Sequence, residues 1–335
     1  MTQVEVSATS QESTLAQYLI STRHRGFVRF KPQILYILSY LFLLSILSIF
    51  NKKSVFVFSL NALLFLVFLI IASFIVAHFL KSKDYSAFTL AIEWSPIFLI
   101  TYIYRTLATL NENIIYPRVH VKELYILEEK IFSKIFGGQM PNYWLYNHFH
   151  CPVVDFIVGV IYITDLFIPV CILLYFYLKQ DRSSFYYGTL ILAGIGFFSV
   201  IIFAVFPAAA PWYVEHFGFQ QPQLIYAENY SWYLAAKLKN FDQLVNYPFF
   251  NNFYRGQSRD FFAAFPSVHV AYGFATILIT HKHWKRKSLL VSAPYALLVF
   301  FSAVYSYHHY IIDGLAGIVC CIISALVAEI LQKHM

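Results

Sequence analysis

The chain has 335 residues, of which 59% are hydrophobic, 20% aromatic and only 12% charged. This composition excludes an ordinary soluble domain, in which about 25% of the residues carry a charge. The formal net charge is +7, but the basic residues lie in short segments between apolar runs, which argues against nucleic-acid binding.

Apolar residues occur in long blocks that predict membrane helices. Several blocks approach or exceed the ~20 residues that an α-helix needs to cross a bilayer. We therefore predict an all-α polytopic membrane protein with about eight transmembrane helices. The predicted spans cover residues 34–50, 55–80, 86–109, 152–178, 186–206, 266–281, 289–306 and 310–331. The predicted domains are an N-terminal tail (1–33), two N-terminal membrane helices (34–85) and a membrane domain (86–335).

Basic residues indicate the orientation of the predicted helices. On an eight-helix count, thirteen of the 24 basic residues lie in short segments on one side of the membrane, and the positive-inside rule makes that side cytoplasmic. They are Arg23, Arg25, Arg29, Lys31, Lys81, Lys83, Lys179, Arg182, Lys282, Lys285, Arg286, Lys287 and Lys333. Both termini are then cytoplasmic, and the long loops 110–151 and 207–265 are non-cytoplasmic.

The two long loops are not simple connections. Residues 122–136 place Leu124, Leu127, Ile131 and Ile135 at helical spacing, which predicts an amphipathic helix that either lies on the membrane or packs within the loop. Loop 207–265 is rich in aromatic residues, so we expect it to be ordered and to cap whatever the helices enclose.

The motif HHYIID at 308–313 begins the last predicted span. His309 and Asp313 are four residues apart, which places both side chains on one face of a helix. A carboxylate there can hold the imidazole in one tautomer and leave its other nitrogen free to attack. The simpler reading is a hydrogen-bonded pair that anchors a helix end.

The motif FPSVH at 265–269 opens the segment before. If Pro266 is the first helical residue, Ser267 and His269 lie in the first turn, where free backbone amides favour phosphate binding. Ser267 could hold a phosphate oxygen and His269 could protonate a leaving oxygen. The alternative is a serine helix cap beside an interfacial histidine.

The predicted topology brings the two motifs together. The cytoplasmic segment at 282–288 separates them, so both lie on the non-cytoplasmic side. Ionisable groups at membrane depth are unfavourable by roughly 2.5–3.5 kcal/mol each on insertion scales and are usually functional. We therefore expect His269, His309 and Asp313 to share one site.

The paired motifs resemble the second and third signatures of the type 2 phosphatidic acid phosphatase superfamily, P-S-x-H followed by H-x-x-x-D. Three stretches are most similar to the inositol phosphorylceramide synthase branch, namely FPAAAPWY at 206–213, FFAAFPSVH at 261–269 and HHYIIDGLAG at 308–317. The resemblance implies a six-helix core, His309 as a nucleophile that forms a phosphohistidine, Asp313 as its orienting carboxylate, and His269 as the acid and base. It implies no metal and no cofactor.

The chain lacks the phosphate-binding basic residues of the phosphatase pattern. Phosphatase members carry an arginine six residues before the nucleophile, where this chain has Ala303, and no Arg-Pro dipeptide occurs. This departure favours phosphodiester chemistry. Arg255 and Arg259 are the candidates for neutralising the phosphate, followed by Arg105 and Arg118. In the loop motif, Ala208 and Ala210 replace threonine and proline. These differences leave undecided which headgroup would be transferred.

These patterns predict a lipid phosphotransferase that moves a phosphorylated headgroup, phosphoinositol first of all, from a glycerophospholipid to a lipid hydroxyl such as that of ceramide. Its partners would be membrane lipids. Its membrane would be the Golgi membrane in a eukaryote or the cytoplasmic membrane in a bacterium, with the site on the luminal or periplasmic face.

Three alternatives remain open. A lipid phosphate phosphatase would release inorganic phosphate through the same motifs. A transporter or scaffold would use Glu93, Asp155 and Asp165, the acids inside predicted spans, as pathway residues. A di-iron oxidase would use several of the 12 histidines, although the chain lacks the H-x-x-x-H and H-x-x-H-H boxes of that class.

Overall fold

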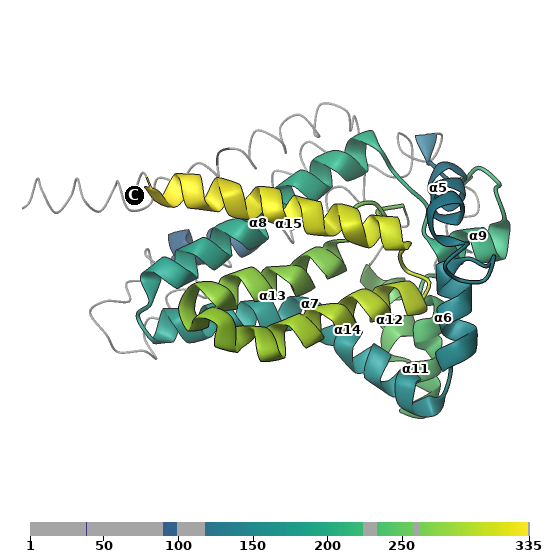
Figure 1. Ribbon diagram of the computed structural model, residues 1–335, viewed down its shortest axis with the longest axis horizontal. Helices are drawn as coiled ribbons and strands as arrows, with labels where there is room; N and C mark the ends of the chain where they lie inside the picture. The colour runs from purple at the N-terminus through teal and green to yellow at the C-terminus, as the bar shows by residue number, and fades with distance from the viewer. Residues whose placement is uncertain (1–37, 39–89, 99–117, 224–232, 258–261, 334–335) are drawn as a thin grey trace, which may run out of the picture.

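The computed structural model describes residues 38, 90–98, 118–223, 233–257 and 262–333. Within these residues every regular element is a helix, which confirms the all-α class. Figure 1 shows a bundle of long helices with several short helices gathered at one end.

Five long helices form the bundle. They are α7 (Pro152–Leu178), α8 (Arg182–Val205), α13 (Val268–Trp284), α14 (Leu289–Tyr305) and α15 (Ile311–Lys333). Each coincides within a few residues with a predicted span. Their mean composition is strongly apolar because they are buried on one side by protein and exposed to lipid on the other.

Membrane crossing is supported for the described helices by length and composition. The stretches Arg182–Val205, Val268–Tyr305 and Ile311–Lys333 are long and apolar enough, and the second comprises both α13 and α14. Helix α7 adds a fourth if its two halves, which meet at 47°, form one span. The chain is therefore treated as an integral membrane protein.

The count of eight helices stays a prediction. The predicted tail 1–33 and the spans 34–50, 55–80 and 86–109 fall outside the described residues, apart from Leu38 and the helical stretch 90–98.

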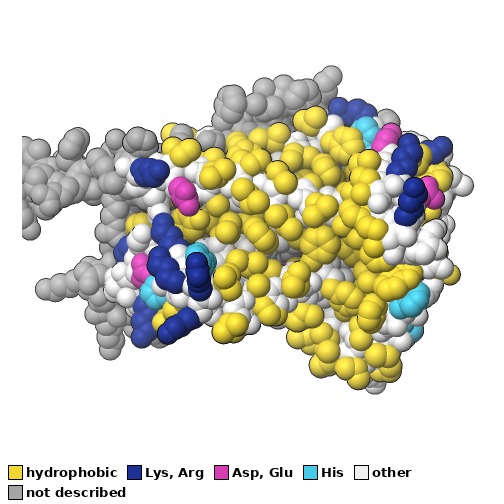
Figure 2. All heavy atoms as spheres, viewed as in Figure 1, with side chains coloured by type: hydrophobic (Ala, Val, Ile, Leu, Met, Phe, Trp, Pro, Cys, Tyr) yellow, Lys and Arg dark blue, Asp and Glu magenta, His cyan; other side chains and the backbone are white. Residues whose placement is uncertain are grey.

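The surface of the bundle agrees with this placement. Figure 2 shows hydrophobic side chains over the middle of the molecule, with charged side chains gathered at its two ends. Large apolar residues exposed along the bundle include Phe167 (63%), Leu290 (81%) and Leu326 (56%). Exposure on this scale fits contact with lipid better than contact with water.

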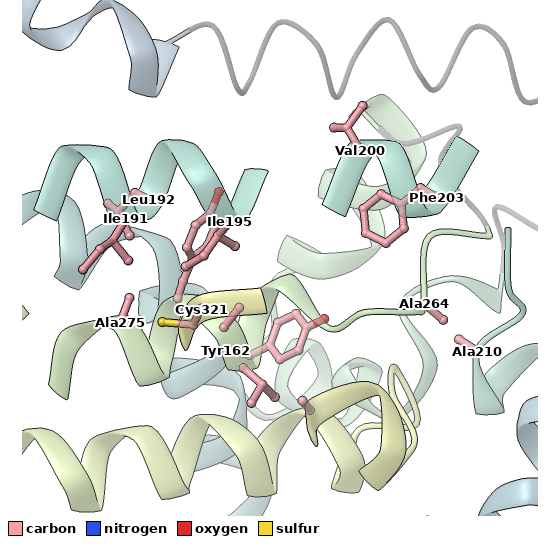
Figure 3. Packing of buried hydrophobic residues seen from close by; sticks show 14 of the residues in the cluster. Tyr162, Ile191, Leu192, Ile195, Val200, Phe203, Ala210, Ala264, Ala275 and Cys321 are labelled. Atoms are coloured by element: carbon pink, nitrogen blue, oxygen red, sulfur yellow. The ribbon is translucent and has the colours of Figure 1, made fainter. Parts of the chain in front are cut away.

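The core is densest around α8. Figure 3 shows Ile191, Leu192 and Ile195 of α8 directed toward α13 and α15, where Ala275 and Cys321 lie. All five side chains are at most 1% exposed. Small residues at the crossing let the helix backbones approach closely, which is the usual way that membrane helices pack.

The two long loops form the short helices at one end of the bundle. Residues 118–151 contribute α5 (Glu123–Phe132) and α6 (Pro141–Phe149). Residues 207–265 contribute α9 (Pro211–Phe217), η4 (Ala236–Leu238), α11 (Lys239–Leu244) and α12 (Phe249–Gln257). The basic turn η5 (Lys285–Ser288) lies at the opposite end, between α13 and α14.

Helix α5 differs from the predicted amphipathic helix. It ends at Phe132, and of the four apolar residues expected on one face, only Leu124 is buried. Leu127, Ile131 and Ile135 are 46%, 50% and 74% exposed. The face that packs on the protein instead carries Leu124 and, one turn later, the carboxylate of Glu128.

Candidate active site

The two histidines predicted to share a site lie together. His269 is in the first turn of α13, and His309 is in the connection between α14 and α15. Their ring centroids are 5.5 Å apart. The start of α13 and the connection from α14 to α15 lie at the end of the bundle that carries the short helices, opposite the basic turn η5 (Figure 1).

Main-chain groups fix the position of His309. Its backbone N–H donates to the Ala303 carbonyl over 3.1 Å, and its Nδ1 lies 2.9 Å from the Ala264 carbonyl oxygen. A carbonyl can only accept a hydrogen bond, so Nδ1 carries the proton and Nε2 has its lone pair free. The side chain is only 6% exposed.

Asp313 lies beside His309, as the four-residue spacing predicts. Its Oδ2 is 3.7 Å from Nδ1 of His309, which is an ion-pair distance and not a hydrogen bond. The same oxygen accepts from the Tyr310 N–H over 2.8 Å. Asp313 therefore places a carboxyl group next to the imidazole, while the Ala264 carbonyl sets the tautomer.

His269 is held by two groups that sequence analysis did not assign to the site. Its Nδ1 is hydrogen-bonded to Asp165, and its Nε2 lies 2.8 Å from the Tyr162 hydroxyl. Both partners come from α7. Because a carboxylate only accepts, Nδ1 of His269 is a donor. The sequence signal for Asp165 was an acid inside a predicted span, which had been considered only as a transport residue.

Ser267 acts as a helix cap. Its hydroxyl accepts from the Val270 N–H over 3.3 Å, and the residue is fully buried. Its backbone N–H donates to the Asp313 carbonyl over 2.8 Å, which ties the two motifs together. The helix begins at Val268, so the expectation that Pro266 is its first residue is wrong. Ser267 has extended backbone angles and takes the N-cap position.

The FPAAAPWY segment is hydrogen-bonded to the residues just before the FPSVH motif. Ala208 forms isolated bridges with His120 and with Ala263. Its N–H donates to the Phe262 carbonyl over 2.8 Å, and its own carbonyl accepts from the Ala264 N–H over 3.3 Å. The segment therefore fixes the stretch whose carbonyl holds His309.

His308 and His309 both favour the neutral form. Burial, and then the nearby charge of His269, lowers the pKa of His308 to about 3 and lowers the pKa of His309 well below its usual range. A neutral imidazole is the form that can act as a nucleophile. His308 packs against Tyr162 and Tyr254, with ring centroids 5.0 and 5.2 Å away.

Two of the four predicted phosphate-binding cations lie among the described residues. Arg255 lies in α12, the helix that also carries Tyr254. Arg259 and Arg105 fall outside the described residues, and Arg118 is exposed. Ala303, where phosphatase members carry arginine, is fully buried.

The acids considered for a transport pathway all have partners. Glu93 is paired with Arg182 over 3.0 Å. Asp155 accepts from the Tyr305 hydroxyl over 2.7 Å and lies 3.1 Å from His150. The Glu93–Arg182 and Asp155–Tyr305 contacts each join residues of two different helices.

Comparison with known proteins agrees with the geometry. Residues 138–327 match the family model described as the PAP2 superfamily, and the chain belongs to that superfamily. Among curated proteins it is similar to a phosphoinositol dihydroceramide synthase of Bacteroides thetaiotaomicron. The two are 30% identical over 219 residues, which cover 63% of this chain and 68% of the relative. No solved structure matches. The resemblance drawn from the motifs is thereby confirmed.

Proposed function

We propose that the chain is a membrane lipid phosphotransferase that moves phosphoinositol from a glycerophospholipid to the hydroxyl of a ceramide-type lipid. One observation carries the proposal. His309 has its Nδ1 fixed on the Ala264 carbonyl and its Nε2 free, with His269 beside it at 5.5 Å between ring centroids. A positioned nucleophile next to an acid–base group is the arrangement that two-step phosphoryl transfer needs.

In the first step, Nε2 of His309 attacks the phosphorus of the donor lipid and forms a P–N bond. The P–O bond to diacylglycerol breaks, and protonated His269 gives its proton to the departing alkoxide. The products are diacylglycerol and a phosphoinositol group on His309. Asp313, 3.7 Å from Nδ1, stabilises the positive charge that develops on the imidazole.

In the second step, the acceptor hydroxyl attacks the same phosphorus. His269, now neutral, takes the hydroxyl proton, the P–N bond breaks, and neutral His309 is regenerated. His269 acts as an acid in the first step and as a base in the second, so each step leaves it in the form that the next one needs. Asp165 on Nδ1 of His269 stabilises the protonated form that begins and ends the cycle.

Two observations favour transfer to a lipid over hydrolysis to inorganic phosphate. Position 303 is a buried alanine, so the arginine that phosphatase members use against a dianionic phosphate is not available there. A phosphodiester carries one negative charge and requires less neutralisation. The similarity to a synthase named for phosphoinositol and dihydroceramide points the same way.

We place the site on the membrane face opposite the basic connections. It would be periplasmic in a bacterial cytoplasmic membrane and luminal in a Golgi membrane. The positive-inside rule supports this orientation. The basic turn η5 lies at the opposite end of the bundle from the start of α13 and the α14–α15 connection, which carry His269 and His309.

The test offers purified protein phosphatidylinositol and ceramide and identifies the lipid products by mass spectrometry. The proposal predicts inositol phosphorylceramide and diacylglycerol in equal amounts, and neither from His309→Ala. A phosphomonoester lipid is offered in parallel. Release of inorganic phosphate from it, with no transfer to ceramide, would establish the phosphatase alternative instead.

A further inference from the structure

A carboxylate outside the two motifs accepts hydrogen bonds from the first backbone amides of α15. Glu128 lies in α5, 183 residues away in the chain from its partner Ile311. Its Oε1 accepts from the Ile311 N–H over 2.9 Å, and its Oε2 accepts from the Ile312 N–H over 3.1 Å. These are the first two residues of α15, whose amides have no partner within the helix.

The contact is enclosed by apolar side chains. Glu128 is fully buried, and Leu124, one turn earlier on α5, packs in one cluster with Ala208, Tyr310 and Ile312. Two hydrogen bonds donated by backbone amides to one carboxylate in such surroundings are stronger than they would be in water. The negative charge also lies at the positive end of the α15 dipole, which adds to the attraction.

Glu128 holds the second and third residues after His309. The chain runs from His309 through Tyr310 to Ile311, so the backbone that Glu128 holds is two residues from the nucleophile. Asp313, which lies beside His309, is in the same first turn. A shift of this turn would move both groups relative to His269 on α13.

We propose that Glu128 is a positioning residue of the active site, which holds the first turn of α15 so that His309 and Asp313 face His269. Glu128 touches neither substrate nor reacting atoms and acts through the backbone of Ile311 and Ile312. The inference rests on the proposed function, because it concerns the same nucleophile.

The ionisation of Glu128 provides an independent readout. Burial raises its pKa to about 7, against the lowering effect of the two amides. The titratable groups that face it are Tyr310 and Asp313, from the α15 side. Below pH 7 the protonated form accumulates, and its hydroxyl oxygen is a poor acceptor for the second amide. Part of the acidic fall in activity should therefore belong to Glu128.

The experiment measures kcat, KM and their pH dependence for Glu128→Gln and Glu128→Asp. Glutamine keeps one oxygen that can accept from a backbone amide, but its NH2 group, a donor, would face the other backbone N–H. Aspartate keeps the charge on a shorter side chain. The matched control is Glu129→Gln, a neighbouring exposed residue of the same type. The folded fraction of each variant is measured by size-exclusion chromatography in detergent.

The proposal predicts a loss of about 10- to 100-fold in kcat for Glu128→Gln, as expected when reacting groups are misplaced by about 1 Å. KM should change little, Glu128→Asp should be intermediate, and the activity fall near pH 7 should disappear in Glu128→Gln. Glu129→Gln should match the wild type.

The inference is overturned if Glu128→Gln keeps wild-type kcat, or if its loss equals the loss of folded protein and the pH profile is unchanged. His309→Ala separates this outcome from failure of the proposed function. An inactive His309→Ala with a fully active Glu128→Gln would reject only the role of Glu128, whereas an active His309→Ala would reject the mechanism itself.

Discussion

The imidazole of His309 is held by the carbonyl of Ala264, 2.9 Å from its Nδ1. Ala264 lies just before the FPSVH motif, so the segment that carries His269 also sets the tautomer of His309. A second backbone bond, from Ser267 N–H to the Asp313 carbonyl, joins the same two segments. The geometry of the pair therefore depends on main-chain contacts between the motifs as well as on the side chains that define them.

Asp165→Asn should reduce kcat strongly. The asparagine can present an N–H to Nδ1 of His269 and so favour the wrong tautomer, and it removes the charge that stabilises protonated His269. The same change beside a catalytic histidine in serine proteases lowers kcat about 10⁴-fold, so we expect a loss of at least about 100-fold here. Measured turnover with phosphatidylinositol and ceramide checks it.

The control for that variant is Asp155→Asn. Asp155 lies on the same helix and is equally buried, at 5% exposed, but its partners are His150, Asn240 and Tyr305. We expect lower thermal stability and a much smaller loss of kcat. Equal losses of kcat in the two variants would mean that Asp165 has no special relation to catalysis.

Ser267→Ala should affect stability more than substrate binding. The buried hydroxyl caps α13 through the Val270 N–H, and loss of an N-cap destabilises by about 1 kcal/mol. The melting temperature should fall. KM for the donor lipid should stay within a factor of about two, because the capping hydroxyl contributes nothing to substrate binding. A KM increase of tenfold or more would restore the predicted role of Ser267 in phosphate binding.

Gly317→Ala should separate the two motifs. A Cβ at Gly317 would lie 2.2 Å from the Ser267 carbonyl oxygen, which is backbone and cannot rotate away. Overpacking of this kind destabilises by about 1–3 kcal/mol, and activity should fall with it. Gly314→Ala is the comparison, because its Cβ would meet the ring of Phe300, a side chain that can shift. If Gly314→Ala is the more damaging of the two, this packing account is wrong.

Acid should destabilise the protein through His308. Its pKa is lowered to about 3 in the folded state by burial, whereas an unfolded histidine titrates near 6.5. The unfolded state therefore binds the extra proton, so stability is full above pH 6.5 and is lost as pH falls from there toward 3. The slope is about 1.4 kcal/mol per pH unit for one group.

Thermal melts in detergent between pH 7.5 and 4.5 measure this effect. The His308→Gln variant cannot take up the proton on unfolding, so its melting temperature should fall less steeply over that range. Parallel pH profiles for the variant and the wild type would assign the acid sensitivity to other groups.

Sequence patterns predicted the long helices of the bundle and the proximity of His269 and His309. The apolar runs located α7, α8, α13, α14 and α15, because a membrane helix is specified by length and composition. Charge placement then put His269 and His309 at one end, where the structure brings them together. These inferences depend on local patterns or on a simple rule of topology.

The residues that sequence analysis missed act over long distances in the chain. Asp165 is 104 positions from His269, and Glu128 is 183 positions from Ile311. Glu128 also lies in the segment predicted to be an amphipathic helix, and nothing in that pattern distinguishes it from the neighbouring Glu129. Tertiary packing decides which residue bonds to the free amides of a helix or to the ring of a histidine. Local spacing in the sequence does not show it.

The phosphohistidine on His309 is the central claim, and trapping it is the most direct test. Purified protein is incubated with phosphatidylinositol labelled in its phosphate, without ceramide, and the peptide that contains His309 is identified by mass spectrometry. The mechanism predicts an acid-labile phosphoinositol group on His309, lost when ceramide is added and absent from His309→Ala. Turnover without any labelled wild-type protein, or equal labelling of His309→Ala, would contradict it.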